Sequence, residues 1–331
     1  MLGAGSWGTT FAQVLCDAGT PVTLWARRAD VAAAITQIHQ NPGYLPGITL
    51  PSALSATSDV AAALDGADLV VLSVPAQTLR ENLTAWAPLI PDGSLLVSLM
   101  KGIELGSHKR MTEVVREVLD VPPARIAVVC GPNLAREIAE RQFAASVVAC
   151  SDELSAQLMQ RACHTDYFRP YWNTDVLGCE LGGTVKNIIA LAVGVAAALG
   201  LGDNAKASLI TRGLAEMARL GEVMGADPRT FAGLAGMGDL VATCSSPLSR
   251  NRRFGEYLGQ GLNVAQAKEL TTQTAEGVTS YAPVLELARK YGVEMPITEV
   301  VGAVITGRLP VGDVAALLMS RSAKPEWYGT D

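Results

Sequence analysis

The sequence feature that most constrains the fold is a series of short apolar runs in the first half of the chain. Five of them occur at residues 21–26, 68–74, 94–99, 125–130 and 145–149. Near-continuous apolar runs of this length are typical of strands buried on both faces of a parallel sheet. Stretches with helical periodicity lie between them, at residues 31–38, 60–64 and 109–119. This alternation predicts a doubly wound α/β sheet.

The second half of the chain has a different character. Helix-period patterns dominate it, at residues 181–199, 206–224, 279–291 and 311–318, and glycines and prolines punctuate them as helix ends require. A chain of 331 residues is also long for a single core. We therefore expect two abutting domains, an α/β domain at residues 1–173 and an all-α domain at residues 174–331.

Composition narrows the class of protein. Hydrophobic residues make up 49% and charged residues 18%, which favours a folded core, and a net charge of −6 argues against nucleic-acid binding. The longest apolar run, residues 188–202, falls short of the roughly 20 residues of a membrane span, so we interpret it as a buried helix. No signal-peptide pattern opens the chain, and the six cysteines and three histidines show no metal or disulfide spacing. We expect a cytoplasmic protein without a metal or stable membrane insertion.

A glycine loop begins the chain. Gly3, Gly5 and Gly8 fit the pattern GxGxxG, and residues 9–15 can form the helix that follows it. Such glycines allow a tight turn, close approach of backbone to a pyrophosphate, and packing of helix against strand. The loop therefore predicts a Rossmann-type dinucleotide site. Only Met1 and Leu2 precede it, so we expect that about five additional β-forming residues before Met1 would improve cofactor affinity and stability.

Two arginines follow the second predicted strand. NAD-specific sites place an acidic residue there to bind the adenosine ribose, whereas this chain has Arg27 and Arg28. Guanidinium groups suit a 2′-phosphate. We expect NADP to be accepted and preferred, with NAD as the other cofactor. Alternatively, Arg28 faces solvent.

Two lysines lie in apolar or glycine-rich surroundings. Lys101 follows a predicted strand at the sheet edge where ligands bind, so it can reach a phosphate or the nicotinamide end of a cofactor. Lys186 lies near the start of a predicted apolar helix, where desolvation is expected to lower its pKa and fit it for acid–base chemistry. The structural alternatives are a surface lysine at position 101 and a carbonyl-capping lysine at position 186.

A basic segment follows in the helical half. Ser249 can cap a helix that begins at Arg250, which places helix N–H groups beside Arg250 and Asn251. This arrangement predicts a phosphate cradle. Arg252 or Arg253 is expected to belong to a solvated helix face.

Six segments of the chain read, in order, GAGSWGT, SLMKGIE, CGPNLARE, GGTVKNIIA, GMGDLVATCSSPLSRNRRFG and TAEG. They resemble the successive motifs of bacterial NAD(P)-dependent glycerol-3-phosphate dehydrogenases. The resemblance covers essentially the whole chain. It implies a Rossmann domain followed by a helical domain like that of 6-phosphogluconate dehydrogenase, with the active site between them. Lys186-Asn187 also occurs in reductases of the ketopantoate type, whereas the SRNRR segment calls for a phosphorylated substrate.

The resemblance also implies roles for individual residues. Lys186 would be the proton donor or acceptor. The residues matched to cofactor contacts are Ser6, Trp7, Arg27, Arg28, Lys101, Ala135, Arg250 and Glu276. The residues matched to the substrate are Lys101, Gly131, Asn133, Lys186, Asp239, Ser249, Arg250 and Asn251. The family usually has a hydroxyl residue in place of Asn133, so this chain departs from the family pattern at that substrate contact.

The implied reaction is reduction of dihydroxyacetone phosphate to sn-glycerol 3-phosphate for phospholipid synthesis. Arg250, Asn251 and Lys101 would hold the phosphate, Lys186 would protonate the oxygen, and Asp239 would orient Lys186. We expect a homodimer, since twofold assembly is the commonest among soluble oligomers. Two other functions remain open: a different β-hydroxyacid or ketopantoate-type reductase, and a non-catalytic dinucleotide-binding sensor or inactive product of a shortened gene.

Overall fold

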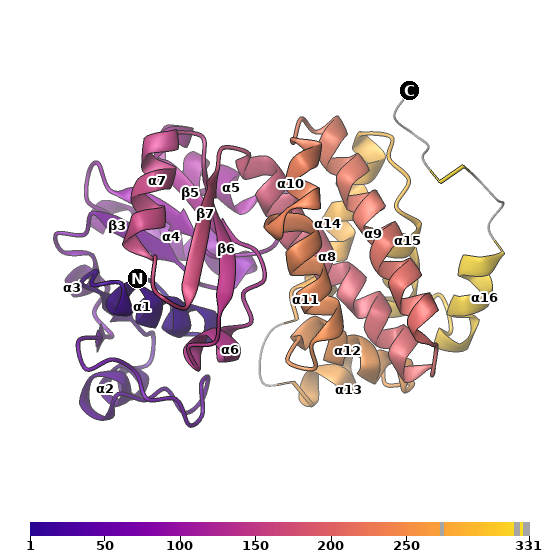
Figure 1. Ribbon diagram of the computed structural model, residues 1–331, viewed down its shortest axis with the longest axis horizontal. Coiled ribbons are helices and arrows are strands. Elements are labelled where there is room, and N and C mark those ends of the chain that lie inside the picture. The colour runs from indigo at the N-terminus through magenta and orange to yellow at the C-terminus, as the bar shows by residue number, and fades with distance from the viewer. Residues whose placement is uncertain (272–274, 321–324, 327–331) are drawn as a thin grey trace. The chain divides into compact units, whose positions relative to one another are not determined.

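A computed structural model of the chain describes residues 1–271, 275–320 and 325–326. These residues form two compact units, residues 1–101 with 109–176, and residues 102–108 with the described residues from 177 onward. Every strand in the described part of the chain belongs to the first unit, and the second is built from helices (Figure 1). The expected domain boundary between residues 173 and 174 stays a prediction, because compactness alone does not show which segments fold independently.

The first unit is organised around a largely parallel sheet. Its strands are β1 (Thr23–Trp25), β2 (Ser55–Thr57), β3 (Leu69–Leu72), β4 (Leu95–Ser98), β5 (Ile126–Cys130), β6 (Ala144–Cys150) and β7 (Phe168–Asn173). Five strands pair in the order β3-β4-β5-β6-β7, in which β6 runs antiparallel to β5, and β1 pairs with β2. Leu2 forms parallel bridges to Trp25 of β1 and to Leu72 of β3. The complete order is therefore β2-β1-Leu2-β3-β4-β5-β6-β7.

The two residues before the glycine loop occupy the centre of this sheet. The N–H of Leu2 donates to the carbonyl of Val71 at 2.7 Å, and the N–H of Trp25 donates to the carbonyl of Met1 at 2.8 Å. The Leu2 side chain is fully buried. Met1 and Leu2 thus make backbone contacts with the strands on either side of them.

Helices cover both faces of the sheet. They are α1 (Ser6–Asp17), α2 (Ala29–Ile38), α3 (Val60–Leu64), α4 (Leu79–Trp86), α5 (Met111–Leu119), α6 (Ala135–Ala139) and α7 (Glu153–Ala162). Val71 of β3 belongs to one apolar cluster with Phe11 of α1, whereas Val70 belongs to another with Leu79 and Val114 of α4 and α5. Successive residues of a strand point to opposite faces, so the two clusters lie on opposite sides of the sheet. The predicted doubly wound architecture is confirmed.

The second unit packs around one long helix, α8 (Val176–Ala198). The other helices are α9 (Asp203–Val223), α10 (Pro228–Ala232), α11 (Asp239–Ser245), α12 (Arg250–Gly259), α13 (Val264–Glu269), α14 (Gly277–Lys290), α15 (Pro296–Ile305) and α16 (Val314–Met319). With 23 residues and a mean hydropathy of 1.6, α8 is long and apolar enough to cross a membrane, but 83% of its most apolar window is buried inside the protein. The apolar run identified in the sequence, residues 188–202, begins later than α8 and is shorter. Its interpretation as a buried helix is confirmed.

A short excursion of the chain, residues 102–108, belongs to the second unit. Ile103 is fully buried in the apolar cluster of that unit. At the end of the excursion His108 adopts a left-handed conformation (φ 56°), and its Nε2 lies 2.7 Å from Oε2 of Glu286 on α14. The chain therefore passes between the two units three times.

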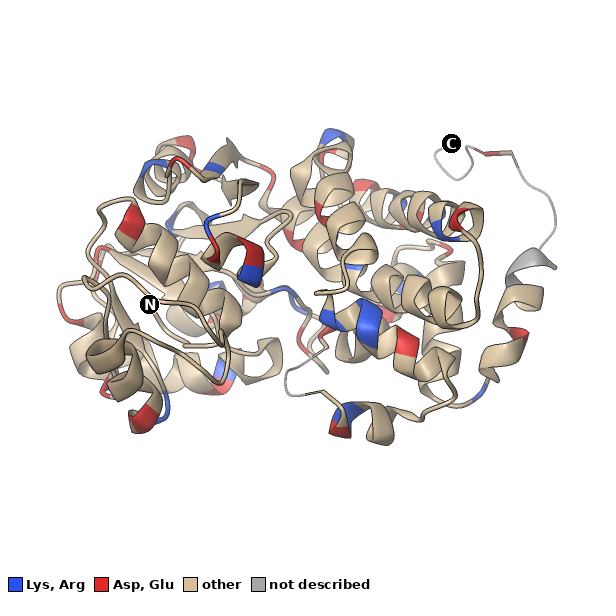
Figure 2. Cartoon of the chain, turned by 60° about the horizontal axis from the view of Figure 1, so that its bottom comes forward, with Lys and Arg blue, Asp and Glu red and all other residues tan. Residues whose placement is uncertain are grey.

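Charged residues of both signs are interspersed along the two units (Figure 2). The whole chain carries 26 basic and 32 acidic residues. The chain as a whole is therefore mildly acidic.

Candidate functional site

The glycine loop has the geometry that its sequence pattern requires. Gly3 has a φ of 119°, and a Cβ there would lie 2.2 Å from the carbonyl oxygen of Ser73. A Cβ at Gly8 would lie 2.1 Å from the carbonyl oxygen of Gly3. Around Gly5, in contrast, no heavy atom lies within 4 Å of the position a Cβ would take. Gly3 and Gly8 thus allow tight packing of the loop, whereas Gly5 leaves open space in which a ligand can approach the protein backbone.

The helix that follows the loop begins without a side-chain cap. Gly5 is the N-cap residue of α1, so the first-turn N–H groups have no capping side chain, and such groups bind anions. Asn41 fixes the loop from the side, because its Nδ2 donates to the carbonyl of Ala4 at 3.0 Å and to Oγ1 of Thr9 at 2.8 Å. The indole Nε1 of Trp7 is buried and has no partner among the described residues. An open helix N-terminus and an unsatisfied donor fit a bound dinucleotide.

The two arginines behind β1 differ in their surroundings. Both are exposed. The guanidinium of Arg28 forms a bidentate ion pair with Asp30, at 3.1 and 2.9 Å. Arg27 makes no hydrogen bond or ion pair within the described ranges. Arg27 is therefore the better placed of the two to receive an additional phosphate.

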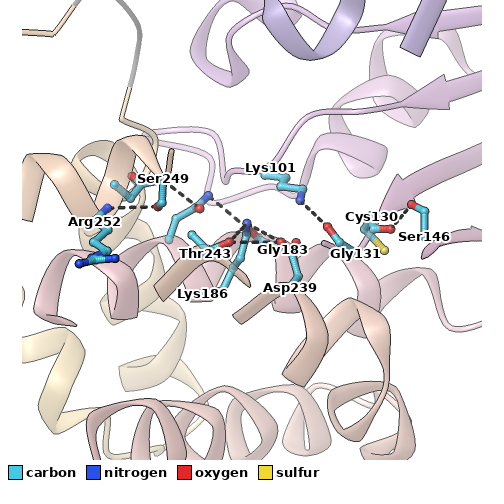
Figure 3. Close-up of polar contacts among 12 residues, drawn as sticks. Lys101, Cys130, Gly131, Ser146, Gly183, Lys186, Asp239, Thr243, Ser249 and Arg252 are labelled. Atoms are coloured by element: carbon cyan, nitrogen blue, oxygen red, sulfur yellow. Dashed lines mark hydrogen bonds and ion pairs between the residues drawn. The ribbon is translucent and has the colours of Figure 1, made fainter. Parts of the chain in front are cut away.

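The carboxyl ends of β4 and β5 bring two further predicted residues together. Lys101 follows β4, and its Nζ donates to the carbonyl oxygen of Gly131, directly after β5, at 3.2 Å (Figure 3). Asn133 lies two residues further on, and its side-chain oxygen and nitrogen are buried without partners in the described part of the chain. A buried amide that lacks partners is rare in a folded protein and is typical of a position where a ligand completes the hydrogen bonds.

Ser6 and Ala135 lie at the start of helices in the same unit. The hydroxyl of Ser6, the first residue of α1, donates to the carbonyl of Tyr44 at 2.9 Å. Ala135 begins α6, and its carbonyl accepts a hydrogen bond from Thr10 of α1 at 3.1 Å. The second hydrogen bond holds the beginning of α6 against the helix of the glycine loop, and the first ties the start of that helix to the loop around Tyr44.

A buried lysine, carboxylate and hydroxyl form the polar centre of the second unit. Nζ of Lys186 lies 2.6 Å from Oδ1 of Asp239 and 2.6 Å from Oγ1 of Thr243, and the three side chains point toward one another (Figure 3). Oγ1 of Thr243 donates in turn to Oδ1 of Asp239 at 3.3 Å. The Lys186 side chain is 8% exposed and that of Asp239 is 1% exposed. In such a site the ion pair compensates the desolvation of both charges.

Lys186 occupies the middle of its helix rather than the start. The sequence placed the helix at residues 181–199, but α8 begins at Val176, ten residues before Lys186. Asn187, the next residue, is also buried, and its Nδ2 donates to the carbonyl of Gly183 at 3.2 Å. The lysine therefore lies on a rigid segment that is helical on both sides.

The segment predicted to form a phosphate cradle lies at the N-terminus of α12, which has a side-chain cap. Oγ of Ser249 accepts a hydrogen bond from the N–H of Arg252 at 3.2 Å, which confirms the predicted cap. Arg250 is exposed. The Arg252 side chain, 22% exposed, donates to the carbonyl of Ser245 and pairs with Glu256, so it supports the helix rather than lying free on a solvated face.

Asn251 links three helices. Its Nδ2 donates to Oδ1 of Asn187 on α8 at 2.9 Å, and its Oδ1 accepts from the N–H of Gly277 at 2.9 Å. Gly277 begins α14, and Glu276 is the N-cap residue directly before it. Asn251 thereby fixes the position of Glu276 relative to the cradle and to Lys186.

Sequence reasoning assigned no role to three of these residues. Thr243 lies four residues after Asp239 on one helix, a spacing that puts both on one face. Asn187 directly follows Lys186, and its buried amide was hidden in an apolar run. Asn41 lies in a loop with no motif, and only the fold brings it to the glycine loop.

Two other chemistries are not indicated by the described residues. No group of three or more His, Cys, Asp and Glu side chains with metal-binding geometry occurs among them. All six cysteines are free thiols, and five are buried. Burial raises the pKa of the Cys244 thiol to about 12, which leaves it protonated and unreactive.

A glycine loop at the centre of a doubly wound sheet, together with a helical unit that carries a buried lysine–carboxylate pair, defines a two-domain nicotinamide-dependent dehydrogenase. Family models described as the N-terminus and C-terminus of NAD-dependent glycerol-3-phosphate dehydrogenase match residues 1–156 and 175–316. The chain belongs to this family.

Individual relatives agree with the family. The chain is 63% identical over 327 residues to glycerol-3-phosphate dehydrogenase [NAD(P)+] of Streptomyces griseus, covering 98% of this chain and 97% of that protein. It is 62% identical over 330 residues to the Thermobifida fusca enzyme of the same name, covering 99% and 98%. The crystal structure of glycerol-3-phosphate dehydrogenase from Coxiella burnetii has a TM-score of 0.91 at 39% identity, over 97% of this chain and 98% of that chain. A ketopantoate reductase from Ralstonia eutropha shares only the fold, with a TM-score of 0.59 and 18% identity.

Proposed function

We propose that the protein reduces dihydroxyacetone phosphate to sn-glycerol 3-phosphate with NADPH or NADH, in a reversible reaction. The observation that carries the proposal is the buried Lys186–Asp239–Thr243 cluster on the helical unit of a chain that belongs to this dehydrogenase family. The cluster offers an ammonium proton in surroundings from which most water is excluded.

The cofactor is proposed to bind the first unit. Gly5 leaves room for a pyrophosphate, Gly3 and Gly8 allow the tight packing of the loop, and the N–H groups of Ser6 and Trp7 at the start of α1 bind the pyrophosphate. The nicotinamide supplies the hydride when it is bound. The Arg27 guanidinium binds a 2′-phosphate, which favours NADP over NAD, and Arg28 can assist if its ion pair with Asp30 opens. Further cofactor contacts are proposed for Lys101, Ala135, Arg250 and Glu276.

Substrate recognition is proposed for three side chains that can bind a phosphate, those of Lys101, Arg250 and Asn251. Asn251 retains one N–H for this purpose, because an amide nitrogen has two donors and only one is engaged by Asn187. Gly131, Asn133 and Ser249 complete the substrate contacts, with Asn133 using its unsatisfied amide.

Proton transfer is proposed for Lys186. Its ammonium donates a proton to the C2 oxygen as that oxygen becomes negative, and it regains a proton in the next cycle. Asp239 keeps the ammonium charged and oriented before transfer, and Thr243 holds the second of its N–H groups. Proton delivery by a positioned group is typically worth a factor of about 10² to 10⁴ in rate.

The product is proposed to feed glycerophospholipid synthesis in the cytoplasm, and the assembly is proposed to be a homodimer. The catalytic proposal is tested by following oxidation of NADPH after addition of dihydroxyacetone phosphate, of ketopantoate, and of buffer alone. Rapid oxidation with dihydroxyacetone phosphate alone supports the proposal. Oxidation with ketopantoate instead, or with neither ketone, would overturn it.

A further inference from the structure

The helix that carries Asp239 is preceded by an unusual turn. Residues Leu234–Gly238 form a π-helical turn, which leads directly into α11 at Asp239. Wide turns of this kind are rare in proteins and often occur at functional sites. The position of the turn therefore determines how far the backbone of Asp239 lies from Lys186.

One side of this turn lies against α8 through backbone alone. A Cβ at Gly182 would be 2.5 Å from the carbonyl oxygen of Ala235 and 3.7 Å from Cα of Gly236. Gly182 lies one helical turn before Lys186, so both residues are on the same face of α8. The face of α8 that holds the lysine is therefore also the face on which the turn rests.

The other side of the turn is equally tight. A Cβ at Gly236 would be 2.2 Å from the carbonyl oxygen and 2.4 Å from Cα of Phe231 on α10. Phe231 is 1% exposed and cannot yield toward solvent. The turn is thus held between α8 and α10 with no side chain between the backbones on either side.

We propose that Gly182 and Gly236 are positioning residues for proton transfer, because they set the π-helical turn at the distance from α8 at which Asp239 reaches the ammonium of Lys186. The assignment of a reaction to Lys186 rests on the function proposed above. The geometric part, that these two glycines determine the Lys186–Asp239 pairing, stands on the contacts themselves.

The expected effect of a single methyl group follows from these distances. Ordinary van der Waals contact begins at 3.4 Å, so Gly182→Ala requires the turn to move away from α8 by about 1 Å. Nζ of Lys186 and Oδ1 of Asp239, now 2.6 Å apart, would then separate beyond the roughly 3.2 Å limit of a good hydrogen bond. Misplacement of a catalytic group by about 1 Å can cost about a hundredfold in rate.

The test compares Gly182→Ala, Asp239→Asn and the double variant, with kcat measured across pH at saturating NADPH and dihydroxyacetone phosphate. We expect Gly182→Ala to lower kcat by about 10- to 100-fold and to leave the KM for NADPH within about twofold. The alkaline limb of the kcat profile should move to lower pH, because the ammonium loses its carboxylate partner. If Gly182 acts through Asp239, the double variant is no worse than Asp239→Asn. Additive losses, or an unmoved alkaline limb, overturn the proposal.

A control separates positioning from general loss of stability. Gly259 closes α12 at its far end, where a Cβ would lie 2.6 Å from Cβ of Ala198. Gly259→Ala introduces a similar clash on the same α8 helix but twelve residues beyond Lys186. It should lower Tm and leave both kcat and its pH profile close to those of the unchanged protein.

A second readout does not depend on activity. Competitive acetylation of Lys186 by acetic anhydride, followed by mass spectrometry across pH, reports the fraction of neutral amine. Half-maximal labelling should occur at lower pH in Gly182→Ala and in Asp239→Asn than in the unchanged protein. If Gly182→Ala does not fold, Gly236→Ala displaces the same turn from its other side and should give the same shift.

The labelling result distinguishes failure of this inference from failure of the proposed function. Shifted labelling in a protein that does not reduce dihydroxyacetone phosphate would confirm the positioning and reject the reaction. Unshifted labelling in an active protein would reject the positioning alone.

Discussion

Lys186 shows how one charged residue is kept in the middle of an apolar helix. Its 23-residue helix is buried from Gly178 to Ala196, so the ammonium reaches water poorly and relies on Asp239 and Thr243. Removing one partner of a buried ion pair typically costs about 3 to 5 kcal/mol, because the other charge is left uncompensated. A substitution at Lys186 must therefore be tested for stability as well as for turnover.

Lys186→Ala is expected to lower kcat by about 10² to 10⁴-fold, because it removes the proposed proton donor. Cofactor affinity should stay near normal, since the glycine loop belongs to the other unit. Steady-state kinetics and a direct NADPH titration measure the two quantities. Lys186→Ala combined with Asp239→Asn serves as a control, since it removes the uncompensated charge and should recover stability without recovering turnover. Unchanged turnover in Lys186→Ala would reject the role of this lysine.

Arg27→Ala is expected to reduce kcat/KM for NADPH by about tenfold or more, because a charge-assisted hydrogen bond is worth about 1.5 to 3 kcal/mol. The value for NADH should change little, since NADH lacks the 2′-phosphate. Arg28→Ala is the matched control and should have a smaller effect, because Arg28 already pairs with Asp30. An unaltered NADPH-to-NADH ratio in Arg27→Ala would contradict the assignment.

A further buried acidic residue is held at the beginning of α15. Glu216 of α9 is 1% exposed and accepts hydrogen bonds from the N–H of Ile297 at 2.6 Å and from the N–H and hydroxyl of Thr298 at 3.3 and 3.2 Å. These donors are the first-turn groups of α15, which lacks a side-chain cap of its own. Burial raises the pKa of Glu216 from 4.5 to about 7, and the hydrogen bonds offset this only in part.

This shift predicts a pH-dependent stability. The folded protein holds the Glu216 proton between pH 4.5 and about 7, whereas the unfolded chain releases it. The contribution of Glu216 is therefore fully present below pH 4.5 and declines by about 3 kcal/mol as pH rises through 7. Denaturant unfolding of the unchanged protein and Glu216→Gln at several pH values measures it. The difference in free energy of unfolding between the two should vary over this window, and a constant difference would contradict the prediction.

Single residues were predictable where their local sequence defined their environment. The Ser249 cap needed only its neighbours, and Lys186 stood out as a lone charge in an apolar run. The pairing of Lys186 with Asp239 was suggested only by resemblance, because 53 residues separate them and a π-helical turn decides the distance. No local pattern announces such a turn.

At the scale of elements, α8 organises the second unit by close contact with its neighbours. A Cβ at Gly194 would lie 2.0 Å from the carbonyl oxygen of Arg252, and one at Gly255 would lie 2.1 Å from that of Leu191. The backbones of α8 and α12 thus touch where they cross. Since α12 begins at Arg250, this crossing fixes the cradle relative to Lys186.

Gly255→Ala is expected to destabilise the protein by about 1 to 3 kcal/mol, since overpacking forces the two helices apart. The better helix propensity of alanine, worth about 1 kcal/mol, offsets part of this. The KM for dihydroxyacetone phosphate should rise, because the cradle moves with α12. Thermal unfolding and steady-state kinetics measure both effects. Gly202→Ala, where no heavy atom lies within 4 Å of the new Cβ, is the control and should change neither. A fully stable Gly255→Ala would disprove the close crossing.

Most elements could be predicted from hydrophobic periodicity, and the exceptions have physical causes. Four of the five predicted apolar runs contain a strand, and the fifth, residues 145–149, lies within β6. The sequence missed β2, which has three residues and no apolar run, and β7, an edge strand with Pro170 and alternating exposure. The reversed direction of β6 was also missed, because an apolar run carries no information about its orientation.

At the scale of the whole molecule, two units of different architecture divide the proposed tasks. The α/β unit carries the glycine loop, and the helical unit carries Lys186 and the phosphate cradle. The change from alternating strands and helices to helices alone was visible in the sequence. The sequence did not show that residues 102–108 belong to the helical unit, because their placement depends on contacts with helices distant in the sequence.

The proposed homodimer predicts a species of twice the 34.6 kDa chain mass. A symmetric dimer is the commonest arrangement for soluble oligomers. Analytical ultracentrifugation across a range of protein concentrations measures it, with bovine serum albumin as a mass standard. A species of 34.6 kDa at every concentration would exclude the dimer.

The excursion at residues 102–108 has a consequence for the evolution and engineering of this enzyme. Ile103 is a core residue of the helical unit that is encoded within the first half of the gene. A chimaera made by joining the first half of one homologue to the second half of another would insert a foreign side chain into a packed interior. Recombination should therefore succeed only when the segment 102–108 is inherited together with α14, whose Glu286 pairs with His108. These seven residues therefore require the two halves of the gene to be inherited from the same homologue.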